Sequence, residues 1–347
     1  MSLLSEKVPF GRTGLEIPPI VFGSSCLGNL YEELPFETKL SIAGEWVKNV
    51  DHPVIDTAGK YGAGLALEMI GKCLRELGVP GEAVTVSNKL GWKRVPLRGS
   101  EPTFEPGAWA NLKNDAEQNI SYKGILECYD QGCELIGPEY APQVVSIHDP
   151  DEYLNAAVDV ADRERRLDDV VEAYNALHEL KKQGRVKAIG VGSKDWRIIR
   201  ELDALVELDW IMFACSLTPY THDAELLEFI DGLHGRGVGM INSAVFNAGF
   251  LVGGEFFDYR KPDPVKEVEL FDWRKKFLST CSRFEVIPAE ACVRFGMAVP
   301  GIISTALNTS KPSNVLRNVK AVEAEIPAEF WSELKDQNVI DPSFKYL

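Results

Sequence analysis

The sequence predicts an α/β fold in which eight parallel strands and their helices close into a single (β/α)8 barrel. From Ile20 onward, apolar β-branched runs alternate with amphipathic helical stretches, and eight such units follow one another. The chain has 347 residues, a length that barrels of this kind reach as one domain. No internal repeat, low-complexity segment or linker interrupts it, so we expect one domain over residues 1–347.

The expected elements begin with a hairpin over Val8–Pro18, where two short extended pieces flank a Gly-Arg-Thr-Gly turn. We expect the eight strands at Ile20–Cys26, Val54–Ala58, Val84–Lys89, Val144–His148, Ala188–Ser193, Trp210–Cys215, Val238–Ala244 and Gly301–Ala306. Apolar residues at helical spacing predict helices over Phe36–Lys48, Leu65–Leu77, Tyr122–Ile136, Asp169–Gln183, Trp196–Val206, Asp223–Leu233, Phe271–Phe284, Pro288–Met297 and Pro312–Val322.

Three connections are long for a compact domain, and each follows a strand. Gly91–Ser121 and Val245–Leu270 are rich in aromatic residues and Gly, whereas Asp149–Asp168 is strongly charged. Connections of this length are often functional lids, and these three fall on the carboxyl-terminal face, where barrels place their chemistry. We expect the two aromatic-rich loops to cover a ligand and the charged one to be a solvated excursion.

Composition and charge exclude several classes of protein. The net charge of −15 disfavours nucleic acid or an anionic membrane as a partner. No apolar run is long enough to span a bilayer, and Met1–Lys7 lacks the core of a signal peptide. The 7 cysteines form no CxxC pair, which indicates buried free thiols in a reducing compartment. We therefore expect a cytoplasmic protein, and the sequence leaves its oligomeric state open.

Titratable side chains end three consecutive predicted strands. Asp56 lies in the second strand with Tyr61 five residues later, Lys89 ends the third strand, and His148 ends the fourth. Neighbouring strand ends lie close together in a barrel, so these side chains should converge. Each residue alone has an ordinary explanation: a loop-capping Asp, a packed Tyr, a solvated Lys or a core His. Their joint occurrence favours an active site.

The chemistry of this group follows from its charges. A free tyrosine has a pKa of about 10, and a nearby ammonium lowers it. We expect Lys89 to supply that charge, with Asp56 holding Lys89 in place, so that Tyr61 exchanges a proton near neutral pH. His148 would orient a substrate oxygen. The chain lacks a GxSxG elbow, and one His and one Asp are too few for a metal site. A tuned acid/base without a nucleophile or metal suits hydride transfer with a bound cofactor.

The segments FGRTGLEIPPIVFG, IDTAGKYG, SNKLGW, SIHDP and KKQGRVKAIGVG, in this order, resemble the landmarks of the aldo-keto reductases over nearly the whole chain. The resemblance places that family's Asp, Tyr, Lys, His tetrad on Asp56, Tyr61, Lys89 and His148. It implies a barrel whose base is closed by the hairpin. It also implies an extended nicotinamide cofactor bound without a Rossmann fold, and no GxGxxG motif is present in Gly62-Ala63-Gly64 or Gly190-Val191-Gly192.

The same resemblance places the adenosine end of the cofactor on Leu307–Asn318. NADP-preferring relatives commonly carry a Lys in the register of Asn308 and an Arg in that of Asn314, where they hold the 2′-phosphate. Neutral Asn at both positions predicts a preference for NAD, although Lys311 and Arg317 leave NADP possible. Ser243 stands where relatives carry the aromatic that stacks on nicotinamide, and Phe246 is a substitute. The expected cofactor contacts are Gly23, Ser193, Ser243, Phe246, Asn247, Gly249, Asn308, Thr309, Ser310, Asn314 and Asn318.

Finer resemblance concerns the substrate. KYGAGLALE, IGVGSKDW and NSAVFNAGFLVGG resemble the aldose 1-dehydrogenases, which oxidise L-fucose, L-galactose or D-threo-aldoses to lactones with NAD. Tyr61 would then be the base for the anomeric hydroxyl, and Trp92 and Trp109 would stack against a sugar substrate. Two alternative enzymes stay open, a general NADP-linked aldehyde or ketone reductase and a pyridoxal dehydrogenase. A non-catalytic subunit that binds the cofactor to sense redox state is a third.

Overall fold

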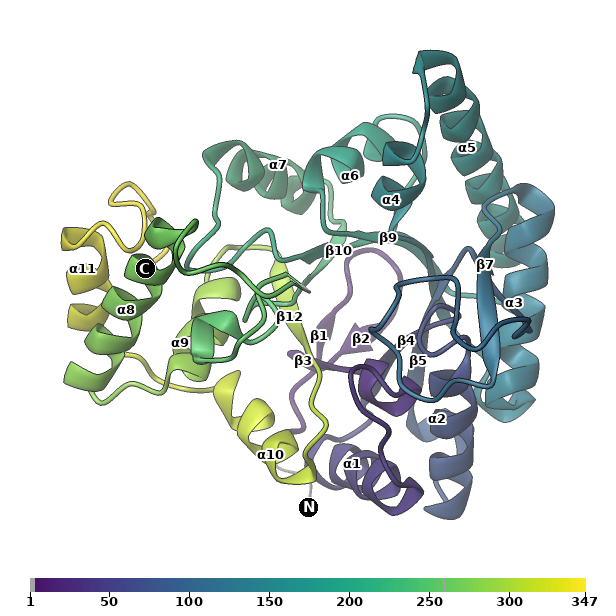
Figure 1. The fold of residues 1–347 in the computed structure, drawn as a ribbon, viewed down its shortest axis with the longest axis horizontal. Helices are drawn as coiled ribbons and strands as arrows, with labels where there is room; N and C mark the ends of the chain where they lie inside the picture. Colours follow the sequence, from purple (N-terminus) through teal and green to yellow (C-terminus); the bar gives the residue numbers. More distant parts are fainter. Residues whose placement is uncertain (1–3, 259) are drawn as a thin grey trace.

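A computed structural model, which describes residues 4–258 and 260–347, places eight parallel strands in a closed barrel ringed by helices (Figure 1). The strand order around the barrel is β10-β11-β12-β3-β4-β5-β8-β9, which is the sequence order once the ring is closed. The barrel strands are β3 (Ile20–Gly23), β4 (Val54–Ala58), β5 (Thr85–Leu90), β8 (Val144–His148), β9 (Ala188–Ser193), β10 (Trp210–Ala214), β11 (Gly239–Ser243) and β12 (Ile302–Leu307). The predicted (β/α)8 fold is confirmed. Residues 1–3 of the expected domain, and residue 259 of its third long loop, lie outside the described residues.

The helices lie on the outside of the barrel and bury their apolar faces against it. Because α10 packs against α1, the last and first units of the ring adjoin, as Figure 1 shows. The helices are α1 (Phe36–Asn49), α2 (Leu65–Glu76), α3 (Tyr122–Ile136), α4 (Pro150–Asn155), α5 (Val160–Lys182), α6 (Trp196–Asp203), α7 (Ala224–Gly235), α8 (Val268–Arg283), α9 (Pro288–Gly296), α10 (Pro312–Ala321) and α11 (Ala328–Asp336).

The strand register brings the expected site residues to neighbouring positions. Ala58 of β4 pairs with Lys89 of β5, and His148 of β8 pairs with Gly192 of β9. β3 is shorter than expected, because its backbone turns into a short 3₁₀ helix at Ser25–Gly28. The carboxyl ends of β4, β5 and β8 therefore meet on one side of the barrel mouth.

The amino-terminal hairpin closes the opposite end. It consists of β1 (Val8–Pro9) and β2 (Glu16–Ile17), which pair antiparallel. Phe10 and Ile17 of the hairpin are buried against Val54 and Trp210 in the floor of the barrel. Gly11 has a φ of +55°, and a Cβ atom there would collide with the backbone of β11, so the turn approaches the barrel as only glycine allows. This is the hairpin that the residues predicted, at the base of the barrel where the family resemblance placed it.

One predicted loop contains strands. Within Gly91–Ser121, β6 (Trp92–Pro96) and β7 (Asn114–Gln118) form an antiparallel hairpin. Their residues are largely polar and only partly buried, so the alternation of apolar and polar residues that marks a strand is weak. The hairpin is anchored on α2, because Arg94 donates to Glu68 at 2.7 Å.

The charged connection Asp149–Asp168 is mostly helical, which corrects its prediction as a solvated excursion. It forms α4 and the first turns of α5, which begins at Val160 and not at Asp169. Asp159 caps α5 by accepting a hydrogen bond from the Asp162 amide. Arg165 then pairs with Asp162 and Asp169 at helical spacing. Such ion pairs support the first turns of α5, which lack the apolar stripe that the helix carries from Val170 onward. A further helix, α11, follows the predicted end of the barrel.

None of the helices in the described ranges combines the length and apolar character needed to cross a membrane. The seven cysteines are free, and five of them are buried.

Candidate active site

Three of the four expected residues form one buried hydrogen-bonded group at the carboxyl end of β4 and β5. The Lys89 ammonium pairs with the Asp56 carboxylate and donates to the phenol oxygen of Tyr61 over 3.1 Å. Asp56 also accepts a hydrogen bond from Ser87 at 3.2 Å. Asp56 and Lys89 are 3% and 4% exposed, so the ion pair is held inside the barrel. The side chains that the sequence predicted to converge do so.

His148 completes the group from β8. Its ring meets that of Tyr61 edge to face, with 5.5 Å between centroids. Burial holds the pKa of His148 well below its usual value, and the nearby Lys89 and Lys60 ammoniums lower it further. The imidazole is therefore neutral, with one donor and one acceptor nitrogen. Its buried Nδ1 has no hydrogen-bond partner within the described chain, so a polar ligand atom would satisfy it.

The proton affinity of Tyr61 differs from the prediction. The pKa of Tyr61 lies well above its ordinary value, because burial disfavours the phenolate and the carboxylates of Asp56 and Asp149 oppose its charge. Lys60 acts in the opposite direction. The expectation that Tyr61 titrates near neutral pH is therefore wrong, because burial and the nearby carboxylates dominate its pKa. Its phenol keeps its proton at neutral pH and is poised as a proton donor.

The loop after β5 forms an aromatic wall beside Tyr61. Trp109 lies 6.0 Å from Tyr61 between ring centroids and 6.2 Å from Phe104, which in turn lies 5.9 Å from Trp92. Trp109 is only 6% exposed, and its indole donates to Glu105 at 2.7 Å. Both tryptophans that the sequence assigned to substrate thus lie at the site. Their rings are largely packed against protein, which leaves little ring face for a ligand.

A charged cluster that sequence reasoning missed adjoins the tetrad. Lys60 is 1% exposed, and its ammonium lies 2.8 Å from Glu105, 2.7 Å from Glu152 and 3.5 Å from Asp149. Lys194 also contacts Glu152, at 3.2 Å. The only signal in the sequence was a lysine directly before the tyrosine of IDTAGKYG, because its three carboxylate partners come from distant segments.

The residues expected to bind the adenosine end lie where β12 ends and α10 begins. Asn308 is exposed, and its amide donates to Ser25 beyond β3 at 2.8 Å. Gly23 lies so close that a Cβ atom there would be 3.1 Å from that of Asn308. Among the described residues no side chain caps α10; Pro312 has no amide hydrogen, and the Asn314 amide donates to the Lys311 carbonyl at 3.0 Å.

The other residues of this expected set follow on the same segment. Thr309 accepts a hydrogen bond from the Lys311 amide at 3.1 Å, which shapes the turn into the helix. Ser310 lies within that turn. Asn314 is in the first turn of α10 and Asn318 is one turn further along it. The segment therefore presents neutral polar side chains, which fit the cofactor expected there.

The expected nicotinamide contacts are placed at strand ends, but two of their hydroxyls are already engaged. Ser193 accepts from the Asp195 amide at 3.2 Å, and Ser243 donates to the Phe213 carbonyl at 3.0 Å. Both hydroxyls are therefore hydrogen-bonded to backbone groups of the protein.

The loop after β11 is bent tightly. Asn247 and Gly249 have φ angles of +44° and +94°, and Phe246 packs against the core. Asn247 is fully buried and donates to Asp258 at 3.0 Å. Its Oδ1 has no partner among the described residues, so this loop, like His148, offers an unsatisfied polar atom that fits a ligand. Nowhere in the described ranges do three or more His, Cys, Asp or Glu side chains come together as a metal site.

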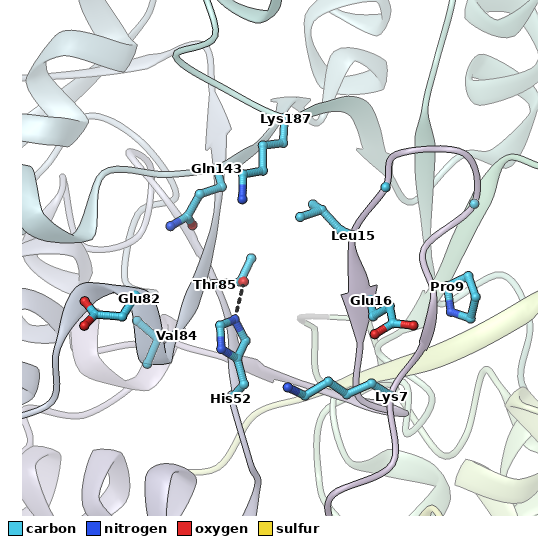
Figure 2. Close-up of a pocket in the computed structure, with 12 residues that line it drawn as sticks. Lys7, Pro9, Leu15, Glu16, His52, Glu82, Val84, Thr85, Gln143 and Lys187 are labelled. Atoms are coloured by element: carbon cyan, nitrogen blue, oxygen red, sulfur yellow. Dashed lines mark hydrogen bonds between the residues drawn. The ribbon is translucent and has the colours of Figure 1, made fainter.

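A separate cavity of about 610 Å³ lies at the amino-terminal end of the barrel, beside the hairpin (Figure 2). Figure 2 shows the amino groups of Lys7 and Lys187 directed toward a hydrogen-bonded pair, His52 and Thr85, which are 2.9 Å apart. This end of a barrel contributes to stability more than to chemistry. The cavity is on the far side of the barrel from Tyr61, so it is not the catalytic pocket.

Comparisons with known proteins agree with this geometry. The model of the aldo/keto reductase family matches residues 19–338. The chain is 27% identical to a pyridoxal 4-dehydrogenase of Microbacterium luteolum and 26% identical to a D-threo-aldose 1-dehydrogenase of Pseudomonas sp. Both alignments cover 97% of this chain and 98% of the relative. The holo form of an aldo-keto reductase from Bacillus halodurans superposes with a TM-score of 0.68 at 18% identity, over 97% of each chain. The chain therefore belongs to the aldo/keto reductase family of NAD(P)-dependent oxidoreductases.

Proposed function

We propose that this enzyme oxidises an aldose at its anomeric carbon, passes the hydride to NAD and releases an aldonolactone. The observation that carries the proposal is the hydrogen bond from Lys89 to Tyr61, made beside a charged cluster in the same pocket. The hydrogen-bonded pair of Lys89 and Tyr61 supplies an acid/base. The charged cluster suits a substrate that carries many hydroxyl groups. Relatives named for aldose and L-galactose oxidation support this substrate class.

Tyr61 takes the proton of the anomeric hydroxyl during oxidation. Lys89 stabilises, through its hydrogen bond, the phenolate form of Tyr61 that accepts this proton, and Asp56 keeps Lys89 in position. The neutral imidazole of His148 hydrogen-bonds the sugar oxygen and fixes its distance from Tyr61. The nicotinamide cofactor, when bound, supplies the hydride acceptor.

A polyhydroxylated substrate fits the polarity of this pocket. Glu105 and Glu152 present partly exposed carboxylates near Tyr61 and Lys194 a partly exposed ammonium, whereas Lys60 is buried among its carboxylate partners. Displacing water from such groups is costly unless the ligand replaces its hydrogen bonds. An alkyl aldehyde cannot do so, whereas sugar hydroxyls can, so the pocket favours sugars over apolar carbonyls.

NAD is the proposed cofactor. Asn308 and Asn314 provide no positive charge at the positions where a 2′-phosphate would need it. A free 2′-hydroxyl requires only neutral donors and acceptors, which both asparagines offer.

Pyridoxal oxidation is the second candidate. One relative, at 27% identity, is a pyridoxal 4-dehydrogenase.

A substrate panel tests these proposals. L-Fucose, L-galactose, a D-threo-aldose, pyridoxal and methylglyoxal are each assayed with NAD and NADP, or with their reduced forms, through NADH or NADPH absorbance. Sugar oxidation with NAD is the expected result, and turnover of pyridoxal alone would establish the second candidate. Reduction of simple aldehydes with NADPH alone would replace both with a general reductase. Cofactor binding without any turnover would indicate a redox-sensing subunit.

The cellular setting proposed is the cytoplasm, with a small-molecule sugar as the partner. Burial raises the pKa of Cys26 to about 12 and of Cys73 to about 11, so these free thiols are inert. Seven free cysteines suit a reducing compartment. The net charge of −15 argues against nucleic acid as a partner.

A further inference from the structure

We propose that Lys60 is a positioning residue of the active site, which gathers three carboxylates from two segments beside Tyr61 and shields the phenol from their charge. The inference deepens the proposed function and rests on Tyr61 acting as the acid/base. It concerns a residue that precedes Tyr61 directly in the chain.

Lys60 is the centre of the cluster. Its side chain is almost fully buried, its ammonium contacts Glu105, Glu152 and Asp149, and it lies 4.9 Å from the centre of the Trp92 ring. Burial alone would lower the pKa of Lys60. The three carboxylates outweigh burial, so this pKa lies above its usual value and the side chain is charged.

The three carboxylates come from two segments, the loop between β6 and β7 and the start of α4. Glu105 lies in the loop between β6 and β7, Asp149 follows β8, and Glu152 belongs to α4. Glu105 also accepts a hydrogen bond from Trp109, whose ring packs on Tyr61. Lys60 therefore fixes the aromatic loop and α4 relative to the tyrosine.

The charges around Tyr61 show why this arrangement matters to proton transfer. The charged and titratable groups that face Tyr61, from every element packed against it, are Asp56, Lys60, Lys89, Glu105, His148 and Asp149. Burial, Asp56, Asp149 and Glu105 raise the pKa of Tyr61, whereas Lys60 lowers it. Without Lys60 the carboxylates it holds would oppose the phenolate more strongly.

Stability alone does not explain a buried cluster of this kind. Removing charges from water is costly, and well-packed apolar residues of similar volume often stabilise a protein as much or more. The placement of Lys60 next to the reacting tyrosine is better explained by its effect on that residue and on the adjacent loop.

Two substitutions with opposite expected effects test the inference. Lys60→Met keeps the length of the side chain and removes its charge, whereas Glu105→Gln removes one of the carboxylates. The measurement is kcat/KM for oxidation of the substrate identified by the panel, as a function of pH. Lys60→Met is expected to move the ascending limb of the kcat/KM profile to higher pH by about 1 unit or more, because the phenolate of Tyr61 loses a nearby positive charge. Glu105→Gln is expected to move it to lower pH, and Lys60→Arg to restore most of the wild-type profile.

The control variant is Lys93→Met. Lys93 lies on β6, pairs with Glu127 at 2.7 Å and is 35% exposed, so its loss should leave the profile unchanged. Limited proteolysis of residues 91–121 provides a second readout. Cleavage there should be faster in Lys60→Met than in the wild type or in Lys93→Met, because the loop loses the contact between Lys60 and Glu105.

Each outcome decides a different point. A wild-type pH profile in both Lys60→Met and Glu105→Gln would overturn the inference while the proposed function stands. No turnover by the wild type would defeat the proposed function, and unchanged cleavage of Lys60→Met would then overturn the inference as well. If Lys60→Met does not fold, the pH profile of Glu105→Gln tests the inference. An ascending limb of kcat/KM that stays in place or moves to higher pH in this variant would contradict the charge argument.

Discussion

The ammonium of Lys89 lies 3.1 Å from the phenol oxygen of Tyr61 and donates a hydrogen bond to it, which stabilises the phenolate form. Asp56 holds that ammonium through a buried ion pair, so Lys89 cannot turn away from the tyrosine without leaving a carboxylate unpaired. The lysine therefore does not need to contact substrate. Its role is to keep a hydrogen-bond donor in place while the proton on Tyr61 moves.

Tyr61→Phe should abolish most turnover while NAD still binds. The change removes only the hydroxyl, and general acid–base catalysis contributes about 10²–10⁴ in rate. Steady-state kinetics measure the loss, and quenching of tryptophan fluorescence measures NAD binding. Tyr122→Phe, at the exposed start of α3, is the matched control and should behave as the wild type. An active Tyr61→Phe would refute the acid/base role.

The rate of oxidation should rise with pH. The pKa of Tyr61 is raised, so the phenol is protonated at neutral pH and becomes the required base only as pH increases toward that pKa. Reduction, which needs the protonated form, should show the opposite trend and fall at alkaline pH. His148 contributes no ascending limb above neutrality, because its pKa is depressed and the ring is already neutral there. Profiles of kcat/KM in both directions check the signs, and oxidation that slows as the medium becomes alkaline would contradict them.

Adding positive charge at the adenosine end should shift cofactor preference. In Asn308→Lys/Asn314→Arg, two cations would meet a 2′-phosphate, and one charged hydrogen bond contributes about 1.5–3 kcal/mol. We expect kcat/KM for NADP to increase roughly tenfold or more relative to NAD. Asn175→Lys, on the exposed face of α5, changes charge away from the site and should not alter the ratio. A wild type with comparable kcat/KM for the two cofactors would contradict the proposed NAD preference.

The packing of α2 on α3 should depend on Gly71. A Cβ atom there would collide with the backbone carbonyl of Ile136, so Gly71→Ala is expected to destabilise the protein by about 1–3 kcal/mol. Gly232 lies in α7 with open space around its Cα, and Gly232→Ala should stabilise it by up to about 1 kcal/mol. Urea unfolding followed by circular dichroism compares the two. Equal effects would show that α2 and α3 are not packed as described.

Much of the fold could be predicted because its pattern is local. The barrel strands are short apolar runs that contact the strands beside them, and the helices carry apolar stripes at helical spacing. The tetrad was also accessible, because Asp56, Lys89 and His148 each belong to a recognisable strand and the closed barrel brings those strands together. Regions with weak patterns were missed. The polar β6–β7 hairpin and the charged first turns of α5 are formed by ion pairs and capping, which an apolar pattern does not reveal.

The sequence by itself determined the barrel, its hairpin base and the four side chains that meet at its mouth. Only the tertiary structure decided how those side chains are charged. The pKa of Tyr61 depends on burial and on Asp149 and Glu105, which are distant from it in the chain, and together with Asp56 these outweigh Lys60. The partners of Lys60 were hidden for the same reason. Electrostatic interactions act through space and depend on burial. A sequence pattern can therefore identify the acid and the base, but it cannot determine how their surroundings shift their pKa values.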